Sequence, residues 1–324
     1  MAYDPAALRC VPGDTRSLVR IVRSYRQMHD AQDLAARMAD ARKSHHLLPL
    51  FEQVPERRDS WAEFLACLAQ ELLLRGVRWS DRPVVMECIR SLRQLRHPLA
   101  FLPTKLTRTE RRATPPALSC TSSTMWRSCP PPGGFIPKSP PEAGRHLIKS
   151  PIPCRDTATA EQVAAIGAVV KHWNGSPQVL LLQAAEPLTV DELVPVGANR
   201  CLPDGCGTAR GALRDSGREL GAGVRTELHR VFEILLDATY REGSYDRGIG
   251  GAYGRAAVWR SVAGMIRAPL DTPIERVNEL AARWNWFCFD RPERSQDFDD
   301  LHLAVGALSP RGRHLSLLIS HDTD

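Results

Sequence analysis

The sequence predicts an α+β protein: an N-terminal helical-hairpin region, a proline-rich linker, and a C-terminal module of helices packed on a small antiparallel sheet. Three observations predict this class. Apolar residues recur at helical spacing over the first third of the chain, alternate at strand spacing near its end, and are sparse in a proline-rich stretch between the two. We therefore divide the chain into helical hairpins (1–102), a linker (103–155) and an α+β module (156–324).

Composition places the chain among globular proteins. Its 324 residues are 43% hydrophobic and 25% charged, which excludes wholesale disorder, collagen and a coiled-coil rod. No apolar run reaches the ~18 residues of a membrane-spanning helix, and the start of the chain lacks the pattern of an export signal. The nine cysteines are dispersed, which favours reduced thiols over a disulfide framework. We expect a cytoplasmic protein that makes no use of a membrane.

The first region predicts amphipathic helices joined by short loops. Apolar residues from Leu18 to Tyr25 follow one helix face, and a second stripe follows Ser60 and Glu63, which have the spacing of a capping box. Pro83 stands where the first turn of another helix tolerates it, and this helix ends before Pro98. The pattern predicts stacked α-hairpins, a fold that commonly binds proteins, or a plain helical bundle.

The segment 103–155 carries most of the excess positive charge. It holds nine lysines and arginines against two acids, together with 11 of the 25 prolines. The rest of the chain sums close to neutral, so we do not expect the folded parts to bind nucleic acid. The segment is typical of a flexible spacer, although a docking site for a proline-binding module, a basic tether for nucleic acid and a local frame error remain alternatives.

The C-terminal half mixes helices with strands. Thr159 and Gln162 have capping-box spacing, the run Gln178 to Gln183 predicts a buried strand, and small residues from Gly250 to Arg267 predict a helix packed centrally. Pro273 opens a further helix that ends near Trp284.

The strongest pattern is a hairpin over residues 301–320. Apolar residues alternate on both sides of Ser309-Pro-Arg-Gly312, and Trp286 to Asp290 is a predicted neighbouring strand. A three-residue loop with Gly312 left-handed would pair Val305 with Leu317 and gather one continuous apolar face, so we expect a type I turn with a glycine bulge.

The run Gly250-Gly-Ala-Tyr-Gly-Arg255, the triplet Trp259-Arg-Ser261 and the closing His321-Asp-Thr-Asp324 resemble an uncharacterised family of high-GC bacteria, a domain of unknown function. The resemblance covers about Thr226 to Asp324. It implies no activity, cofactor or catalytic residue.

Several groups of residues could carry chemistry. His302, Ser320 and Asp300 would supply an imidazole, a hydroxyl and a carboxylate on one side of the hairpin, as in nucleophilic catalysis, although a solvated sheet face has the same composition. Four residues could grip an acidic ligand or form surface ion pairs instead: Tyr253, Arg255, Arg260 and Arg267.

Cys201 and Cys206 have the spacing of a zinc knuckle, yet no second pair of ligands follows, so we expect no metal. The glycines from Gly248 to Gly254 could cradle a phosphate, but no strand precedes them, and we expect no cofactor. The sequence therefore favours a cytosolic, non-catalytic interaction or regulatory protein that binds protein partners. The alternatives are a hydrolase-like enzyme with its site on the C-terminal module and, less favoured, nucleic-acid binding through the basic linker.

Overall fold

The computed structural model describes residues 15–41, 44–113, 154–175, 177–190, 223–240, 248–249, 251–289 and 301–322. They fall into two compact units. Unit 1 comprises the described residues of Met1–Trp126 and Ile249–Ala256, and unit 2 those of Arg127–Gly248 and Ala257–Asp324. The α+β class is confirmed, because unit 1 is helical and unit 2 contains a six-stranded antiparallel sheet.

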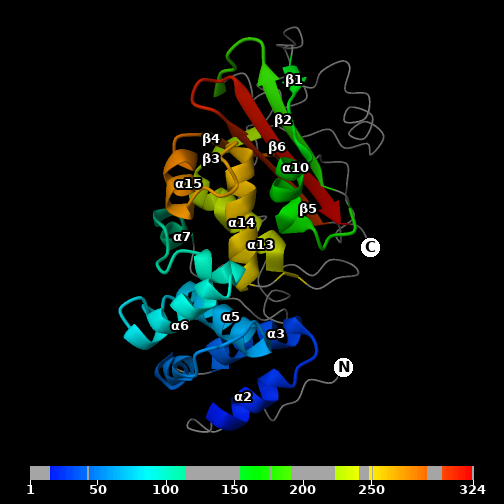
Figure 1. Cartoon of the computed structure of the whole chain (residues 1–324). Coiled ribbons are helices and arrows are strands. Elements are labelled where there is room, and N and C mark those ends of the chain that lie inside the picture. Colours follow the sequence, from blue (N-terminus) through cyan, green and yellow to red (C-terminus); the bar gives the residue numbers. More distant parts are fainter. Residues whose placement is uncertain are drawn as a thin grey trace. The chain divides into compact units, whose positions relative to one another are not determined.

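Unit 1 is built from helices (Figure 1), and one of them, α5, is buried along its whole length. Its elements are α2 (Thr15–Arg23), α3 (Met28–Ala41), α4 (Ser44–Leu47), η1 (Leu48–Glu52), α5 (Ser60–Leu74), α6 (Pro83–Gln94), η2 (Pro98–Phe101), α7 (Arg108–Arg112) and the first residues of α14 (Gly251–Met265). Every residue of α5 is buried, so α5 is the centre of this unit rather than one arm of an exposed hairpin.

The start of α5 differs from the predicted capping box. Asp59 is the N-cap, and its carboxylate accepts the N–H groups of Trp61 and Ala62 at 3.1 Å. The Ser60 hydroxyl donates instead to the carbonyl of Tyr25, and Glu63 is buried. Aspartate caps a helix as well as serine does, so Ser60 and Glu63 are free for contacts that sequence spacing alone does not reveal.

Both ends of the predicted linker contain regular structure. Residues 103–113 belong to unit 1 and contain α7, which starts with a capping box between Thr107 and Glu110. At the other end, Cys154 and Arg155 belong to strand β1 (Cys154–Asp156). Residues 114–153 lie outside the described residues, and a linker there stays a prediction.

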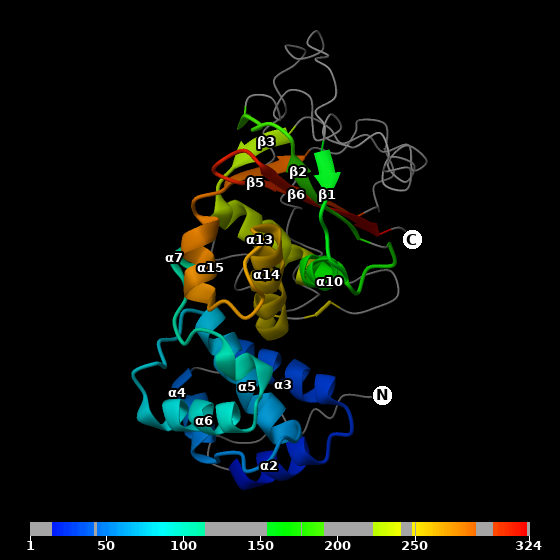
Figure 2. The same cartoon turned by 45° about the horizontal axis from the view of Figure 1, so that its top comes forward.

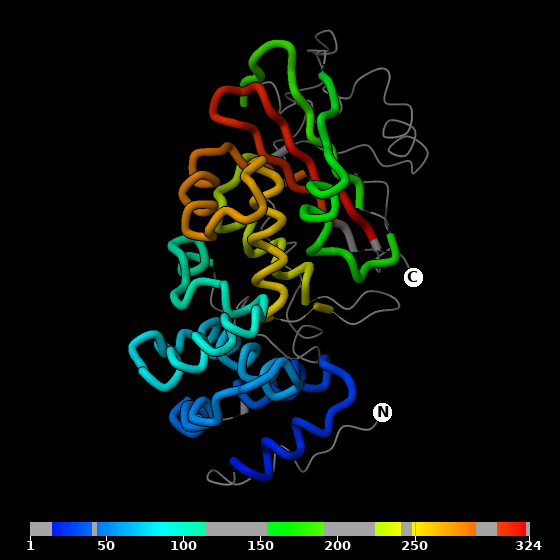
Figure 3. Tube along the Cα trace, in the orientation of Figure 1, coloured from blue at the N-terminus to red at the C-terminus, as the bar shows by residue number. Residues whose placement is uncertain are grey.

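Unit 2 contains an antiparallel sheet in the order β1-β2-β6-β5-β4-β3. The remaining strands are β2 (Gln178–Ala184), β3 (Gly223–Thr226), β4 (Asn285–Phe289), β5 (Leu301–Leu308) and β6 (His314–Asp322). Figure 3 traces β2 beside β6 although they are far apart in the sequence. The predicted strands at 178–183 and 286–290 and the closing hairpin are therefore confirmed as β2, β4 and β5–β6.

The predicted register of the hairpin is wrong by one residue. Val305 pairs with Leu318 and Gly306 with Leu317, so Val305 and Leu317 lie on opposite faces. The loop is one residue longer than predicted, because Ser309 N–H donates to His314 O at 2.8 Å and closes the hairpin. Gly312 is left-handed as predicted, with φ of 68°. The prediction assumed that polar and apolar residues lie on separate faces, but Ser316 and Ser320 are buried opposite Ala307 and Leu303.

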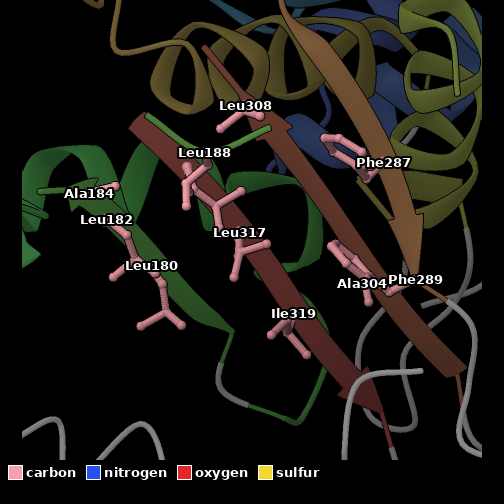
Figure 4. Packing of buried hydrophobic residues seen from close by; sticks show 11 residues of the cluster. Leu180, Leu182, Ala184, Leu188, Phe287, Phe289, Ala304, Leu308, Leu317 and Ile319 are labelled. Atoms are coloured by element: carbon pink, nitrogen blue, oxygen red, sulfur yellow. The ribbon is translucent and has the colours of Figure 1, made fainter. Parts of the chain in front are cut away.

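Helices lie against one face of the sheet (Figure 2): α10 (Ala160–Ile166), α13 (Leu228–Tyr240), α15 (Ile274–Ala281) and the unit 2 part of α14. Two buried hydrogen bonds join this face to helix ends, since Ser316 Oγ donates to Met265 O at 2.6 Å and Trp286 Nε1 donates to Ala281 O at 2.8 Å. The other face carries an apolar cluster that includes Leu182, Leu317 and Phe287 (Figure 4).

The small-residue helix is confirmed as α14, and its packing explains its composition. A Cβ on Gly264 would lie 2.6 Å from Cγ1 of Ile166, so the absent side chain lets α14 approach α10 closely. The capping box between Thr159 and Gln162, predicted for α10, is also present. Among the described helices, none combines the length and apolar character that crossing a bilayer requires.

Candidate functional site

The polar residues of α5 form a row inside unit 1. Glu63, Cys67, Gln70 and Glu71 follow one another at intervals of three or four residues or as neighbours, so they share one side of the helix. All four are buried. Buried polar groups are costly unless they are hydrogen-bonded, so this row requires partners from the rest of unit 1.

Glu63 is the centre of the first group. Its Oε1 accepts from Gln32 Nε2 at 2.9 Å and from the Cys67 thiol at 3.4 Å, and its Oε2 lies 2.9 Å from His97 Nε2. The Tyr253 hydroxyl, from the start of α14, also hydrogen-bonds to Glu63. Four side chains from four parts of the chain therefore meet at one carboxylate.

A tight turn brings His97 into this position. Helix α6 ends with Arg96 in the left-handed region, at φ of 55°, and the His97 N–H donates to Leu92 O at 2.9 Å. This is the hydrogen bonding of a Schellman turn, in which glycine is usual. The imidazole is fully buried, and its Nδ1 has no hydrogen-bond partner among the described residues.

The surroundings shift the pKa values of the group in opposite directions. Burial raises the pKa of Glu63, but the hydrogen bond and charge of His97 and the hydrogen bonds from Tyr253 and Gln32 outweigh it, so the pKa lies below its ordinary value. Burial, with the nearby charges of Glu63 and Glu71, raises the pKa of Cys67 well above its usual range. Burial first, and then the charge of Glu63, also raise the pKa of Tyr253. Cys67 is therefore a neutral thiol, which is a poor nucleophile.

Arg255 is the centre of the second group. Its guanidinium is fully buried and forms a two-point pair with Glu110, with Nε–Oε1 at 2.6 Å and Nη2–Oε2 at 3.1 Å. Nη1 donates to Gln70 Oε1 and to Pro103 O, and Nη2 donates also to Lys105 O. These contacts use all five N–H donors of the arginine. Glu110 is held in place by α7, where its Oε2 also accepts the Thr107 N–H at 2.6 Å.

Glu71 is the centre of the third group, which consists of Glu71, Arg75, Asp40 and the start of α14. Its Oε1 accepts the N–H of Ala252 at 2.9 Å, at the start of α14, and a carboxylate there is favoured by the helix dipole. Its Oε2 lies 2.6 Å from Arg75 Nη1, and Nη2 of the same arginine reaches Asp40 Oδ1 at 2.7 Å. Burial lowers the pKa of Arg75, but Glu71 and Asp40 together raise it by more than burial lowers it. The pKa therefore lies above its ordinary value, and this arginine stays charged.

Sequence reasoning missed most of these residues, although a signal for them was present. The apolar stripe of α5 predicts one buried face and makes no statement about the opposite face. However, α5 is apolar over most of its circumference, and such a helix has no solvent face. Glu63, Gln70 and Glu71 therefore had to be buried with partners.

The predicted catalytic group is not brought together. Ser320 pairs with Leu303 and His302 with His321, so positions 302 and 320 belong to opposite faces of the sheet. The Ser320 hydroxyl is fully buried and has no hydrogen-bond partner among the described residues. Asp300 lies outside the described residues.

The predicted ligand-binding residues lie in different environments. Tyr253 and Arg255 belong to the buried groups of unit 1, and Arg260 is exposed in unit 2. Arg267 does not share a helix face with Arg260, because it follows the end of α14 with φ of 57°. Its Nη1 donates to Thr157 Oγ1 at 2.7 Å and its Nη2 to Leu182 O at 3.1 Å.

Cys201 and Cys206 lie outside the described residues. Within the described ranges, no cluster of three or more His, Cys, Asp or Glu side chains could hold a metal ion. The glycine-rich entry to α14 is packed rather than open at Gly248, where a Cβ would lie 2.7 Å from Tyr240 O.

Comparison with known proteins identifies a family for this chain. A family model described as a family of unknown function matches residues 6–324. The match confirms the uncharacterised family that the C-terminal residues resemble, and it extends well beyond the predicted 226–324. Neither the curated proteins nor the solved structures contain a match.

Proposed function

Because the chain belongs to the family of unknown function DUF6183 over nearly its whole length, we propose its function from its own residues: a non-catalytic binding protein whose recognition surface lies on unit 1. The observation that carries this proposal is the use of the chemically capable side chains of unit 1 inside its core. Glu63, His97, Cys67 and Arg255 are all buried, and their hydrogen bonds go to other side chains and to backbone groups of unit 1.

A catalytic group needs a substrate within hydrogen-bond reach. All five N–H groups of Arg255 already donate hydrogen bonds within the protein, Cys67 is a neutral thiol, and the Glu63 carboxylate already has four partners. Such a network rigidifies a fold and holds its segments in one arrangement. This supports a scaffold whose interior is fixed and whose exterior is available to a partner.

The hydrolase-like alternative has less support. It depended on His302 facing Ser320 across the hairpin, and the observed pairs are His302 with His321 and Ser320 with Leu303. We also propose that the protein works in the cytoplasm, because Cys67 and Cys88, which are buried in unit 1, are thiols and not half of a disulfide.

Affinity capture of the tagged, full-length protein from its own cells tests the proposal. At gentle salt, with parallel samples treated with nuclease, we expect a protein or nucleic-acid partner in stoichiometric amount. A matched variant would replace the three exposed arginines of α2 by glutamine (R16Q/R20Q/R23Q). It should lose that partner and should unfold at the same temperature as the wild type. Recovery of the protein alone, with no stoichiometric partner in either sample, would overturn the proposal.

A further inference from the structure

Unit 1 carries its positive charge outside and much of its negative charge inside. Of its described lysines and arginines, 16 are exposed, and 15 of these are arginines, whereas only five of its acidic residues are exposed. The near-neutral sum expected for the folded parts hides this asymmetry. It averages unit 1 with the rest of the chain, and it counts buried and exposed groups alike.

The buried acids explain how the asymmetry arises. Glu63, Glu71 and Glu110 are buried, and they are used by His97, Arg75 and Arg255 within unit 1. A carboxylate that is paired in the core does not reduce the potential that a partner meets at the surface as an exposed one would. The exterior of unit 1 is therefore more basic than its composition indicates.

Helix α2 shows the exposed positive charge most clearly. Leu18 and Val22 are buried, and Arg16, Arg20 and Arg23 are exposed on the opposite side of the helix. Within the described residues, Arg23 forms an ion pair with Asp59 at 3.3 Å, and Asp59 is shared with Arg57. Three guanidinium groups thus follow one another along about two turns.

Helix α7 repeats the arrangement on a smaller scale. Its single acid, Glu110, is buried against Arg255, while Arg108, Arg111 and Arg112 are exposed. The sequence of this helix has a net positive charge, and burial of its acid increases the positive charge that solvent meets.

The rest of the surface indicates which partner this charge fits. Among the described residues, the large apolar side chains that are exposed are Met28 and Phe101. Protein interfaces have an apolar, aromatic-rich core, whereas interfaces with nucleic acid are more polar and far more positive. Single strands are held by stacking on several exposed aromatic rings, and Trp61 and Trp79 are fully buried.

We infer that the exposed arginines of unit 1 bind the phosphodiester backbone of a nucleic-acid duplex, with α2 as one contact row and without reading base sequence. The inference rests on the proposed function and names the partner of its binding surface. Guanidinium groups pair with phosphate through two hydrogen bonds, and each neutralised phosphate releases counterions. Binding should therefore be strongly dependent on salt.

Fluorescence anisotropy of the full-length protein with a labelled, mixed-sequence DNA duplex tests this inference. We expect the affinity to fall on the order of a hundredfold or more between about 50 and 200 mM salt, as for about four or more neutralised phosphates. The variant R16Q/R20Q/R23Q should bind at least about tenfold more weakly, with a salt slope smaller by about 0.9 per lost contact. A second variant, R108Q/R111Q, should show a smaller loss of the same kind.

The control variant K171Q/R283Q/R311Q removes the same charge from exposed positions of unit 2 and should bind as the wild type does. An unlabelled duplex of different sequence should compete equally. Absence of binding at about 50 mM salt, or an equal loss in the control and α2 variants, would overturn the inference. If capture then recovers an acidic protein in place of nucleic acid, the inference fails while the proposed function stands.

Discussion

The two units treat charge in different ways. In unit 1 exposed basic residues outnumber exposed acidic ones by 16 to five, whereas in the described part of unit 2 the numbers are eight and seven. Unit 1 buries three glutamates with their partners, whereas the described part of unit 2 buries one acid, Asp237, together with serine hydroxyls and apolar strands. The comparison shows that a net charge of +6 for the chain says little about either surface, because burial decides which charges a partner meets.

The largest expected loss of stability follows from removing a buried charge of unit 1. Arg255→Met should reduce the free energy of unfolding by about 3–5 kcal/mol, because Glu110 would remain buried without its cation. Arg260→Met is the matched control on the same helix α14, since Arg260 is exposed, and it should change stability by less than about 0.5 kcal/mol. Denaturant unfolding measures both. Equal losses in the two variants would show that Arg255 is not the central partner we describe.

Two left-handed glycines allow the next comparison. Gly312 in unit 2 has φ of 68°, and a Cβ there would lie 2.2 Å from Leu188 O, whereas Gly76 in unit 1 has φ of 77° and open space around it. Both substitutions by alanine should cost about 1–2 kcal/mol for the backbone conformation, and Gly312→Ala about 1–3 kcal/mol more for the clash. Thermal unfolding measures the difference, and a larger loss at Gly76 would contradict it.

Glu63 should contribute more to the loss of stability in acid than the exposed acids of unit 1. The folded-state pKa of Glu63 is lower than its ordinary value of 4.5. Its carboxylate therefore stabilises the fold above about pH 4.5, and this contribution is lost as the pH falls through the lower folded-state pKa. Glu63→Gln should cost about 1–3 kcal/mol at neutral pH and should show a weaker loss of stability in acid.

Urea unfolding at a series of pH values measures this dependence. Glu52→Gln serves as the control, because Glu52 is exposed, and it should keep the acid dependence of the wild type. The interpretation of Glu63 would be wrong if its variant lost as much stability in acid as the unaltered protein.

The smallest effects distinguish two serines on the same face of β6. Ser316→Ala removes the hydrogen bond to Met265 O and should cost about 1 kcal/mol. Ser320→Ala removes a buried hydroxyl with no hydrogen-bond partner among the described residues, so it should be neutral or slightly stabilising. Melting temperatures of the two variants provide the comparison, and a loss at Ser320 as large as that at Ser316 would indicate a contact that we have not identified.

Periodicity predicted the elements of both units, because it reports which side of a helix or strand is apolar. It predicted α14, β2, β4 and the closing hairpin, and the turn at Gly312. It failed on the register, because it favoured a pairing that keeps polar and apolar residues on separate faces, whereas Ser316 and Ser320 are buried opposite apolar residues.

The candidate site was harder to predict, for a physical reason. Glu63, His97, Tyr253 and Gln32 are distant in the sequence and meet only because their elements pack together. The sequence marks Arg255 as a candidate for an acidic ligand because a guanidinium group pairs with a carboxylate or phosphate through two hydrogen bonds. That acidic group proved to be Glu110 of the same chain.

The order of the chain gives Arg255 a consequence for synthesis. The protein leaves the ribosome from its N-terminus, so Gln70 and Glu110 emerge long before the arginine that unites them. Until residues 249–256 emerge, the N-terminal helices hold one carboxylate, Glu110, whose buried cation does not yet exist. A fragment that stops before α14 should therefore be a poor starting point for expression, whereas residues 249–256 supplied as a separate peptide could complete it.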